Sequence, residues 1–119
     1  MNICLIGDSL TSLALAKNLI NKNIKVFLYY KNTKNPSFQS RTIGISKNNF
    51  DFFNKKIFKF KKDMFWKIRK IEIYSEKLKD EKILNFENNE NELFLTAKNN
   101  EIYQLLEKDL KKKNYLKKF

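Results

Sequence analysis

The chain has 119 residues, enough for one domain, and its 25 basic and 13 acidic residues give a net charge of +12. It contains no histidine, which excludes imidazole acid–base catalysis, Ser-His and Cys-His nucleophile pairs and zinc sites built on histidine ligands. Hydrophobic residues make up 42% of the chain, sufficient for a core, while no apolar run reaches the length of about 18 residues that a membrane-spanning helix needs. We therefore expect one folded domain without a metal site. We expect it to be cytoplasmic, with any membrane contact peripheral, at the inner face.

The first thirty residues predict a βαβ unit. Asn2–Ile6 is a short apolar run bounded by Gly7 and is typical of a buried strand. Residues 10–21 carry apolar side chains at helical spacing, and residues 25–30, rich in β-branched and aromatic side chains, form the next strand. Such a unit normally pairs its two strands in parallel through a right-handed crossover. Cys4, flanked by apolar residues, is predicted to be a buried structural thiol in a reducing compartment.

The middle of the chain predicts a basic helical segment over residues 46–68. Residues 31–39 form an Asn-rich loop, and residues 42–45 are too short to assign. Ser46 is a typical N-cap. Apolar residues then recur at intervals of three and four from Phe50 to Ile68, which favours one or two amphipathic helices.

The last part, residues 69–119, predicts a hairpin followed by a helix. Residues 71–74 alternate apolar and polar side chains, and residues 83–86 are placed to pair with them. Residues 93–96 are ambiguous. Residues 101–113 carry apolar side chains at helical spacing and end in a basic turn, which suits the helix dipole. The expected architecture is α/β over residues 1–119, a single and partial domain with a Rossmann-like core, additional amphipathic helices and a short hairpin.

The excess positive charge is concentrated in the centre of the chain. Residues 31–70 hold twelve basic residues against Asp51 and Asp63, a net +10. An anionic partner would explain this, and so would compositional drift, because only Arg41 and Arg69 are arginines while the other basic residues are lysines. Phenylalanine and tryptophan interleaved with these lysines suit nucleic acid or an anionic lipid surface, but the same pattern describes a helix with a solvated face. We favour drift and expect no nucleic-acid partner.

The turn after the first strand is the most informative motif. A dinucleotide-binding βαβ unit carries G-x-G-x-x-G there, with an acidic residue at the end of the second strand for the ribose. Here Gly7 keeps the first glycine, while Ser9 and Ser12 replace the others and Tyr30 stands where the acid is expected. The turn and the helix N-terminus still suit a phosphate, but Ser9 crowds the pyrophosphate position and the ribose contact is weakened.

Further segments follow in a characteristic order: Arg41 to Ser46, an apolar helix with Phe52-Phe53, Ile68 to Tyr74, and Ala97 to Leu106. This succession resembles the N-terminal part of the flavin-dependent aromatic hydroxylases of ubiquinone biosynthesis, in the p-hydroxybenzoate hydroxylase-like superfamily. The resemblance spans essentially the whole chain.

The resemblance implies an FAD cofactor bound through Gly7, Ser9, Ser12, Tyr30 and Arg41. The family's later D-G and G-D segments normally lie beyond residue 119, so the resemblance implies a truncated domain with weakened cofactor binding, no catalytic residue of its own and no activity alone. A complementary C-terminal hydroxylase half or a ubiquinone-biosynthesis complex is the implied partner. The alternative is a basic, non-catalytic module that binds nucleic acid or an anionic membrane surface.

Overall fold

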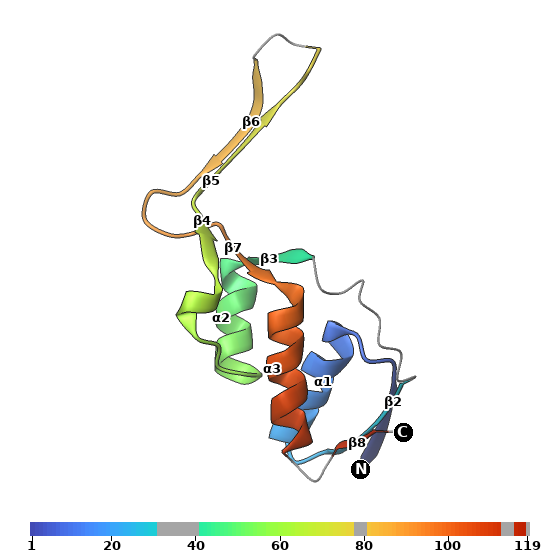
Figure 1. Cartoon of the computed structure of the whole chain (residues 1–119). Helices are drawn as coiled ribbons and strands as arrows, with labels where there is room; N and C mark the ends of the chain where they lie inside the picture. The colour runs from blue at the N-terminus through green and yellow to red at the C-terminus, as the bar shows by residue number, and fades with distance from the viewer. Residues whose placement is uncertain (31–40, 78–80, 113–115, 119) are drawn as a thin grey trace.

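The computed structural model describes residues 1–30, 41–77, 81–112 and 116–118 (Figure 1). Its N-terminal part is a βαβ unit formed by β1 (Asn2–Ile6), α1 (Leu10–Asn21) and β2 (Lys25–Tyr29). The two strands pair in parallel, with Ile3 opposite Val26 and Leu5 opposite Leu28. This confirms the predicted unit. A third parallel strand, β8 (Leu116–Lys118), pairs with the other edge of β2, and the sequence had not indicated it.

Cys4 is exposed, which corrects the prediction of a buried thiol. Along β1, Ile3 and Leu5 are half-buried, whereas Cys4 and Ile6 are exposed. Alternate residues of a strand point to opposite faces of its sheet, so Cys4 shares the face that the helices do not cover. An apolar run alone could not show that only one face of this strand is packed.

A second sheet is antiparallel and has the order β3-β7-β4, formed by β3 (Thr42–Ser46), β7 (Phe94–Lys98) and β4 (Trp66–Ile68). The sequence does not assign segments 42–45 and 93–96; all their residues except Leu93 lie in these two paired strands. Leu95 and Ala97 of β7 are buried, so this sheet packs one face against the helices.

The predicted basic helical segment 46–68 is wrong in its second half. Ser46 does cap α2 (Lys47–Lys56), accepting a hydrogen bond from the Asn49 backbone N–H at 3.3 Å. The helix ends at Lys56, and Asn54 Oδ1 accepts the backbone N–H of Phe60 at 2.8 Å, which holds the chain after the helix back against it. A short 3-10 helix, η2 (Lys62–Met64), and strand β4 follow, and β4 obtains its backbone partners from β7.

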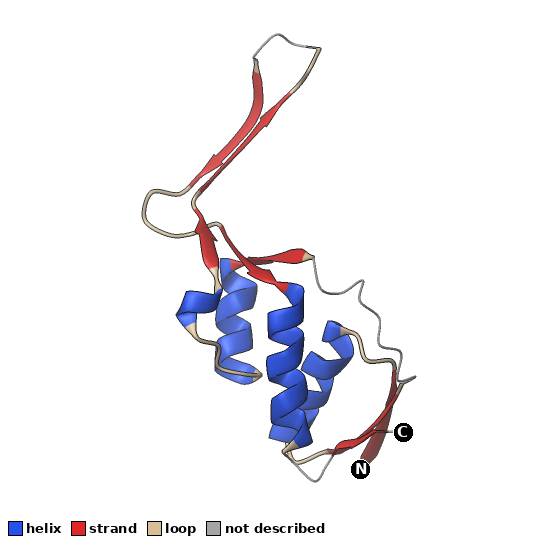
Figure 2. Cartoon of the chain, in the orientation of Figure 1, coloured by secondary structure: helices blue, strands red, loops and turns tan. Residues whose placement is uncertain are grey.

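The predicted hairpin is confirmed. Strands β5 (Lys70–Tyr74) and β6 (Lys82–Glu87) pair antiparallel, with a register irregularity next to Ile73 and Tyr74. Figures 1 and 2 show this hairpin projecting away from the helices. The molecule accordingly measures 56 × 31 × 25 Å.

Helix α3 (Asn99–Lys111) packs against α1 and completes the core (Figure 2). Its Ile102, Leu106 and Leu110 are fully buried. Lys17 of α1 forms an ion pair with Asp109 of α3, and both the pair and the packing join these two helices. The core cluster consists of Leu13, Ala16, Ile20, Val26, Leu28, Phe50, Phe60, Phe65, Leu95, Ala97, Ile102, Leu106 and Leu110.

Candidate functional site

The turn between β1 and α1 depends on the backbone conformation of Gly7. Its φ is +99°, a region that side-chain-bearing residues rarely adopt, yet a Cβ added there would meet no atom within 4 Å. The Gly7 N–H donates a hydrogen bond of 2.8 Å to the Tyr29 carbonyl, which ties the turn to the end of β2. The glycine is thus required for conformation, and the space beside it is open to a ligand.

Ser9 is the N-cap of α1. Its hydroxyl accepts the Ser12 N–H at 3.2 Å and lies 3.1 Å from the Ser12 hydroxyl, while its carbonyl accepts the Leu13 N–H at 3.0 Å. The N–H groups of Leu10 and Thr11, in the first turn, have no acceptor within the helix by geometry. The two serines therefore stabilise the helix start and leave the two backbone donors of the first turn without an acceptor in the helix.

Asp8 places a carboxylate in the same turn, and Tyr103 of α3 holds it there. The Tyr103 hydroxyl donates to Asp8 Oδ2 at 3.2 Å, and burial together with the Asp8 charge raises the pKa of Tyr103 above its ordinary range. A negative charge beside a helix N-terminus competes with a phosphate for the same donors. The sequence does not predict this pair, because no local pattern links residues 95 positions apart.

Tyr30 lies at the same edge as the turn, whereas Arg41 directly precedes a strand of the other sheet. Tyr30 directly follows β2, whose last residue accepts the Gly7 N–H, and its half-buried side chain packs against the core. Arg41 is exposed immediately before β3, and its carbonyl accepts the Asn99 N–H at 2.9 Å. The structure thus brings four of the five predicted cofactor residues, Gly7, Ser9, Ser12 and Tyr30, to one edge of the parallel sheet.

The phenylalanines of the basic segment pack mainly on one another. Phe53 stacks on Phe60 with 5.2 Å between ring centroids, and Phe50 meets Phe65 edge-on at 4.8 Å. Phe52 and Trp66, by contrast, are exposed. The segment therefore presents many lysines but few rings to solvent.

A hollow among the described residues lies away from the β1–α1 turn. It measures about 490 Å³ and is lined by Phe58, Met64 and Leu105 with Lys59, Lys61, Lys108 and two polar residues of α3. None of these residues belongs to β1, α1 or β2. We give more weight to the turn, because its backbone conformation and donors suit a defined ligand, whereas the hollow is a gap between α3 and the chain after α2.

Two further searches covered the described ranges only. Within them, no three Cys, Asp or Glu side chains gather in a way that could hold a metal ion. None of the helices there has the length and apolarity needed to cross a membrane.

No protein-family model and no curated protein matches the sequence. Solved structures do match its fold. The p-nitrophenol 4-monooxygenase of Pseudomonas putida DLL-E4 superposes with a TM-score of 0.73 at 11% identity, over 98% of this chain and 31% of that one. A protein of Photorhabdus luminescens subsp. laumondii TTO1, assigned as an FAD-containing monooxygenase, gives a TM-score of 0.66 at 20% identity, over 99% and 30%.

The 2,6-dihydroxypyridine-3-hydroxylase of Arthrobacter nicotinovorans gives a TM-score of 0.63 at 14% identity, over 98% of this chain and 28% of that one. The chain has the α/β fold of the N-terminal part of these monooxygenases. It spans about 30% of their length.

Proposed function

We propose that this chain is the FAD-binding N-terminal portion of a flavin monooxygenase that hydroxylates an aromatic ring, of the ubiquinone-biosynthesis type. The observation that carries the proposal is the β1–α1 turn. Gly7 adopts a left-handed conformation at the carboxyl edge of a parallel sheet, ahead of a helix N-terminus, in a fold shared with monooxygenases over nearly the whole chain. This is the place where parallel α/β sheets bind nucleotides.

Each residue of the turn has a distinct role in the proposal. Gly7 lets the backbone approach the pyrophosphate, and the N–H groups of Leu10 and Thr11 donate to it. Tyr30 offers its phenol to the ribose of the cofactor. Arg41 directs its guanidinium toward the flavin side of the cofactor. When bound, FAD supplies the redox chemistry of ring hydroxylation, and the protein supplies binding and orientation.

We expect the affinity to be weak and the chain to be inactive alone. The Ser9 side chain already occupies the Ser12 N–H, and Asp8, the residue before the N-cap, adds a negative charge to the turn. Tyr30 cannot supply the carboxylate that normally accepts from the ribose. We assign no catalytic residue to this chain.

Titration calorimetry of the purified chain with ADP and FAD tests the proposal. Removing the carboxylate with Asp8→Ala should tighten ADP binding about fivefold, because a charge near a helix N-terminus is worth about 1 kcal/mol and each 1.4 kcal/mol is tenfold. Asp51→Ala is the matched control, since it removes the same charge from α2, away from the turn. Equal gains in both variants would indicate only a general charge effect, and no ADP binding by any variant at millimolar concentration would refute the proposal.

The alternative, a basic module for nucleic acid or an anionic membrane, is supported by the net charge of residues 31–70. The mutual packing of Phe50, Phe53, Phe60 and Phe65 speaks against it, because base stacking needs exposed rings. We expect at most weak RNA binding that disappears near physiological salt. Submicromolar binding that persists there would reverse this ranking.

A further inference from the structure

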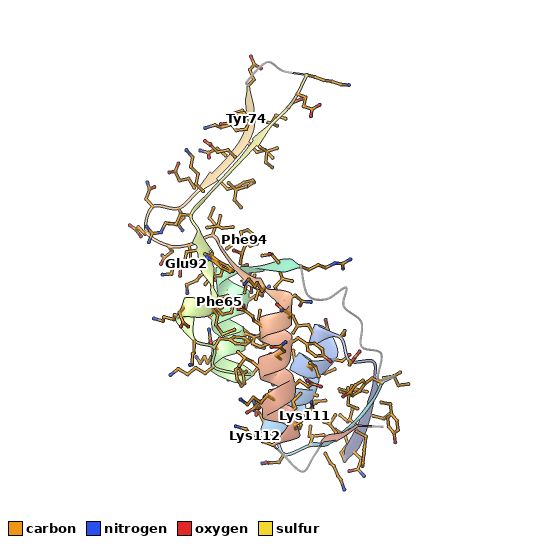
Figure 3. All side chains as sticks on the ribbon, in the orientation of Figure 1. Phe65, Tyr74, Glu92, Phe94, Lys111 and Lys112 are labelled. Atoms are coloured by element: carbon orange, nitrogen blue, oxygen red, sulfur yellow. The ribbon has the colours of Figure 1, made fainter. Side chains whose placement is uncertain are left out.

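Exposed apolar side chains are concentrated on the part of the molecule that leaves the helical body. Of the twelve exposed large hydrophobic residues among those described, seven lie between positions 66 and 94. Figure 3 shows Tyr74 on the outlying hairpin and Phe94 at its base. Scattered apolar residues are normal on a protein surface, but a concentration of this kind marks an interaction site. The seven are Trp66, Ile73, Tyr74, Ile83, Leu84, Phe86 and Phe94.

The β5–β6 hairpin has one apolar and one polar face. The register places Ile71 opposite Phe86 and Ile73 opposite Leu84, so these four side chains share one face, here called the apolar hairpin face. Ile73, Leu84 and Phe86 are 42%, 48% and 51% exposed. An apolar face of an antiparallel sheet is normally packed against a core, and this one faces solvent.

The polar face is already satisfied by its own interactions. Glu72 forms ion pairs with Lys82 and, at 3.0 Å, with Lys70, and it accepts a hydrogen bond of 3.2 Å from the Tyr74 hydroxyl. The hydrogen bonds from these lysines lower the pKa of Glu72 to about 2. The polar face is therefore suited to contact with water, whereas the apolar hairpin face is suited to packing against another apolar surface.

Within the described ranges, β5 and β6 pair only with each other. A two-stranded hairpin is marginal in water without a third strand or a packed layer. The radius of gyration of 17.9 Å also exceeds the value of roughly 14 Å expected for a compact domain of this length. Both observations show that the described residues leave the apolar hairpin face without a packed layer.

We propose that the apolar hairpin face docks against a β-sheet of a second polypeptide, the complementary C-terminal portion of a flavin hydroxylase. The proposal rests on the proposed function. The superpositions with the matched monooxygenases cover 98% to 99% of this chain. About 70% of the length of each monooxygenase has no counterpart in this chain. The remainder of such a hydroxylase is the occupant that we assign, because an apolar β layer is the surface that suits an apolar hairpin.

A second copy of the chain fits the surface less well. Ile6, 87% exposed, and Cys4 form another exposed apolar area on β1, at the opposite end of the molecule from the hairpin (Figure 1). A closed twofold dimer buries one self-complementary patch in each copy and would leave one of these areas open. A large partner can cover both.

An anionic membrane also fits poorly. The described hairpin residues 70–77 and 81–87 carry three lysines and four glutamates, a net charge of −1, so no electrostatic attraction supports lipid docking. The charged residues are Lys70, Lys77, Lys82, Glu72, Glu76, Glu81 and Glu87.

Site-specific photocrosslinking of the full chain in its host cells tests the proposal. A photoreactive phenylalanine analogue replaces Leu84 on the apolar hairpin face or, as control, the adjacent Asn85 on the polar face. We expect at least tenfold more crosslinked product from position 84. Mass spectrometry should place the crosslink in a strand of a polypeptide that carries the D-G and G-D segments of a flavin hydroxylase.

Leu84→Lys and Asn85→Lys provide a second measurement. Leu84→Lys should reduce copurification of that identified polypeptide at least tenfold, whereas Asn85→Lys should leave it within twofold. Crosslinks to a second copy of this chain, to an unrelated protein, or in equal yield from both positions would each overturn the proposal, as would the absence of any product. ADP binding is measured on the same variants, so a chain that binds ADP but fails these tests would keep its proposed function and lose only the docking surface.

Discussion

The ion pair between Lys17 and Asp109 gives a sharp test of how α1 and α3 are held together. The Lys17 side chain is only 8% exposed and that of Asp109 is 27% exposed. The Lys17 ammonium also lies 5.8 Å from the centre of the Phe58 ring, so three segments of the chain meet at this charge. The Asp109 carboxylate offsets the free-energy cost of burying the Lys17 ammonium.

The two partners should therefore respond differently to substitution. Asp109→Ala leaves a buried ammonium without its counterion, and breaking a buried pair in this way costs about 3 to 5 kcal/mol. We expect the lower figure, about 3 kcal/mol, because Asp109 is partly in contact with water. Lys17→Met removes the buried charge and keeps the volume, so it should cost about 1 kcal/mol or less. The double variant should recover most of the loss.

Urea unfolding followed by circular dichroism measures these free energies. Lys111→Met is the control, because Lys111 forms an exposed pair with Glu107 on the same helix and should change stability by less than about 0.5 kcal/mol. If Lys17→Met destabilises the chain as much as Asp109→Ala does, the pair contributes attraction beyond compensating a buried charge. That result would refute the reasoning.

Three other substitutions have defined outcomes. Gly7→Ala should lower the free energy of unfolding by about 1 to 2 kcal/mol through backbone strain alone, whereas Gly44→Ala, whose nearest contact is Phe94 Cδ1 at 3.9 Å, should have little effect; equal losses would contradict this. Leu106→Ala should cost about 3 kcal/mol in chemical denaturation, because the side chain is completely buried, and a cost below about 1 kcal/mol would show a loosely packed core. Glu72 should titrate in NMR with a pKa of about 2 instead of the ordinary 4.5, mainly through its hydrogen bond from Lys82. Since the folded pKa is lowered, this stabilisation of the hairpin is present above pH 4.5 and is lost as the pH falls toward 2, and Lys82→Gln should raise the pKa.

Local sequence patterns determined the elements whose causes are local. The apolar run before Gly7, the helical spacing after Ser9 and the capping hydroxyl of Ser46 each specify a conformation within a few residues, and the strand, the helix and the cap are confirmed. The burial predicted for the first strand is wrong, because its residues are half-buried or exposed. Alternation in residues 71–74 likewise predicted a strand with a nearby antiparallel partner. Gly7 could be identified as the key residue of the turn because its role depends on its own φ.

Tertiary structure decided the features that depend on distant partners. Apolar spacing of three to four residues continues through Phe60 to Ile68, but Asn54 turns the chain back and β7 supplies the backbone partners that make residues 66–68 a strand. The exposure of Cys4 depends on which face of β1 the helices cover. The Asp8–Tyr103 hydrogen bond, which ties the carboxylate of the turn to α3, joins residues that only the packing of α3 brings together. A sequence pattern reports the preferences of a segment, whereas burial, strand pairing and the charge within a turn are set by the segments that pack against it.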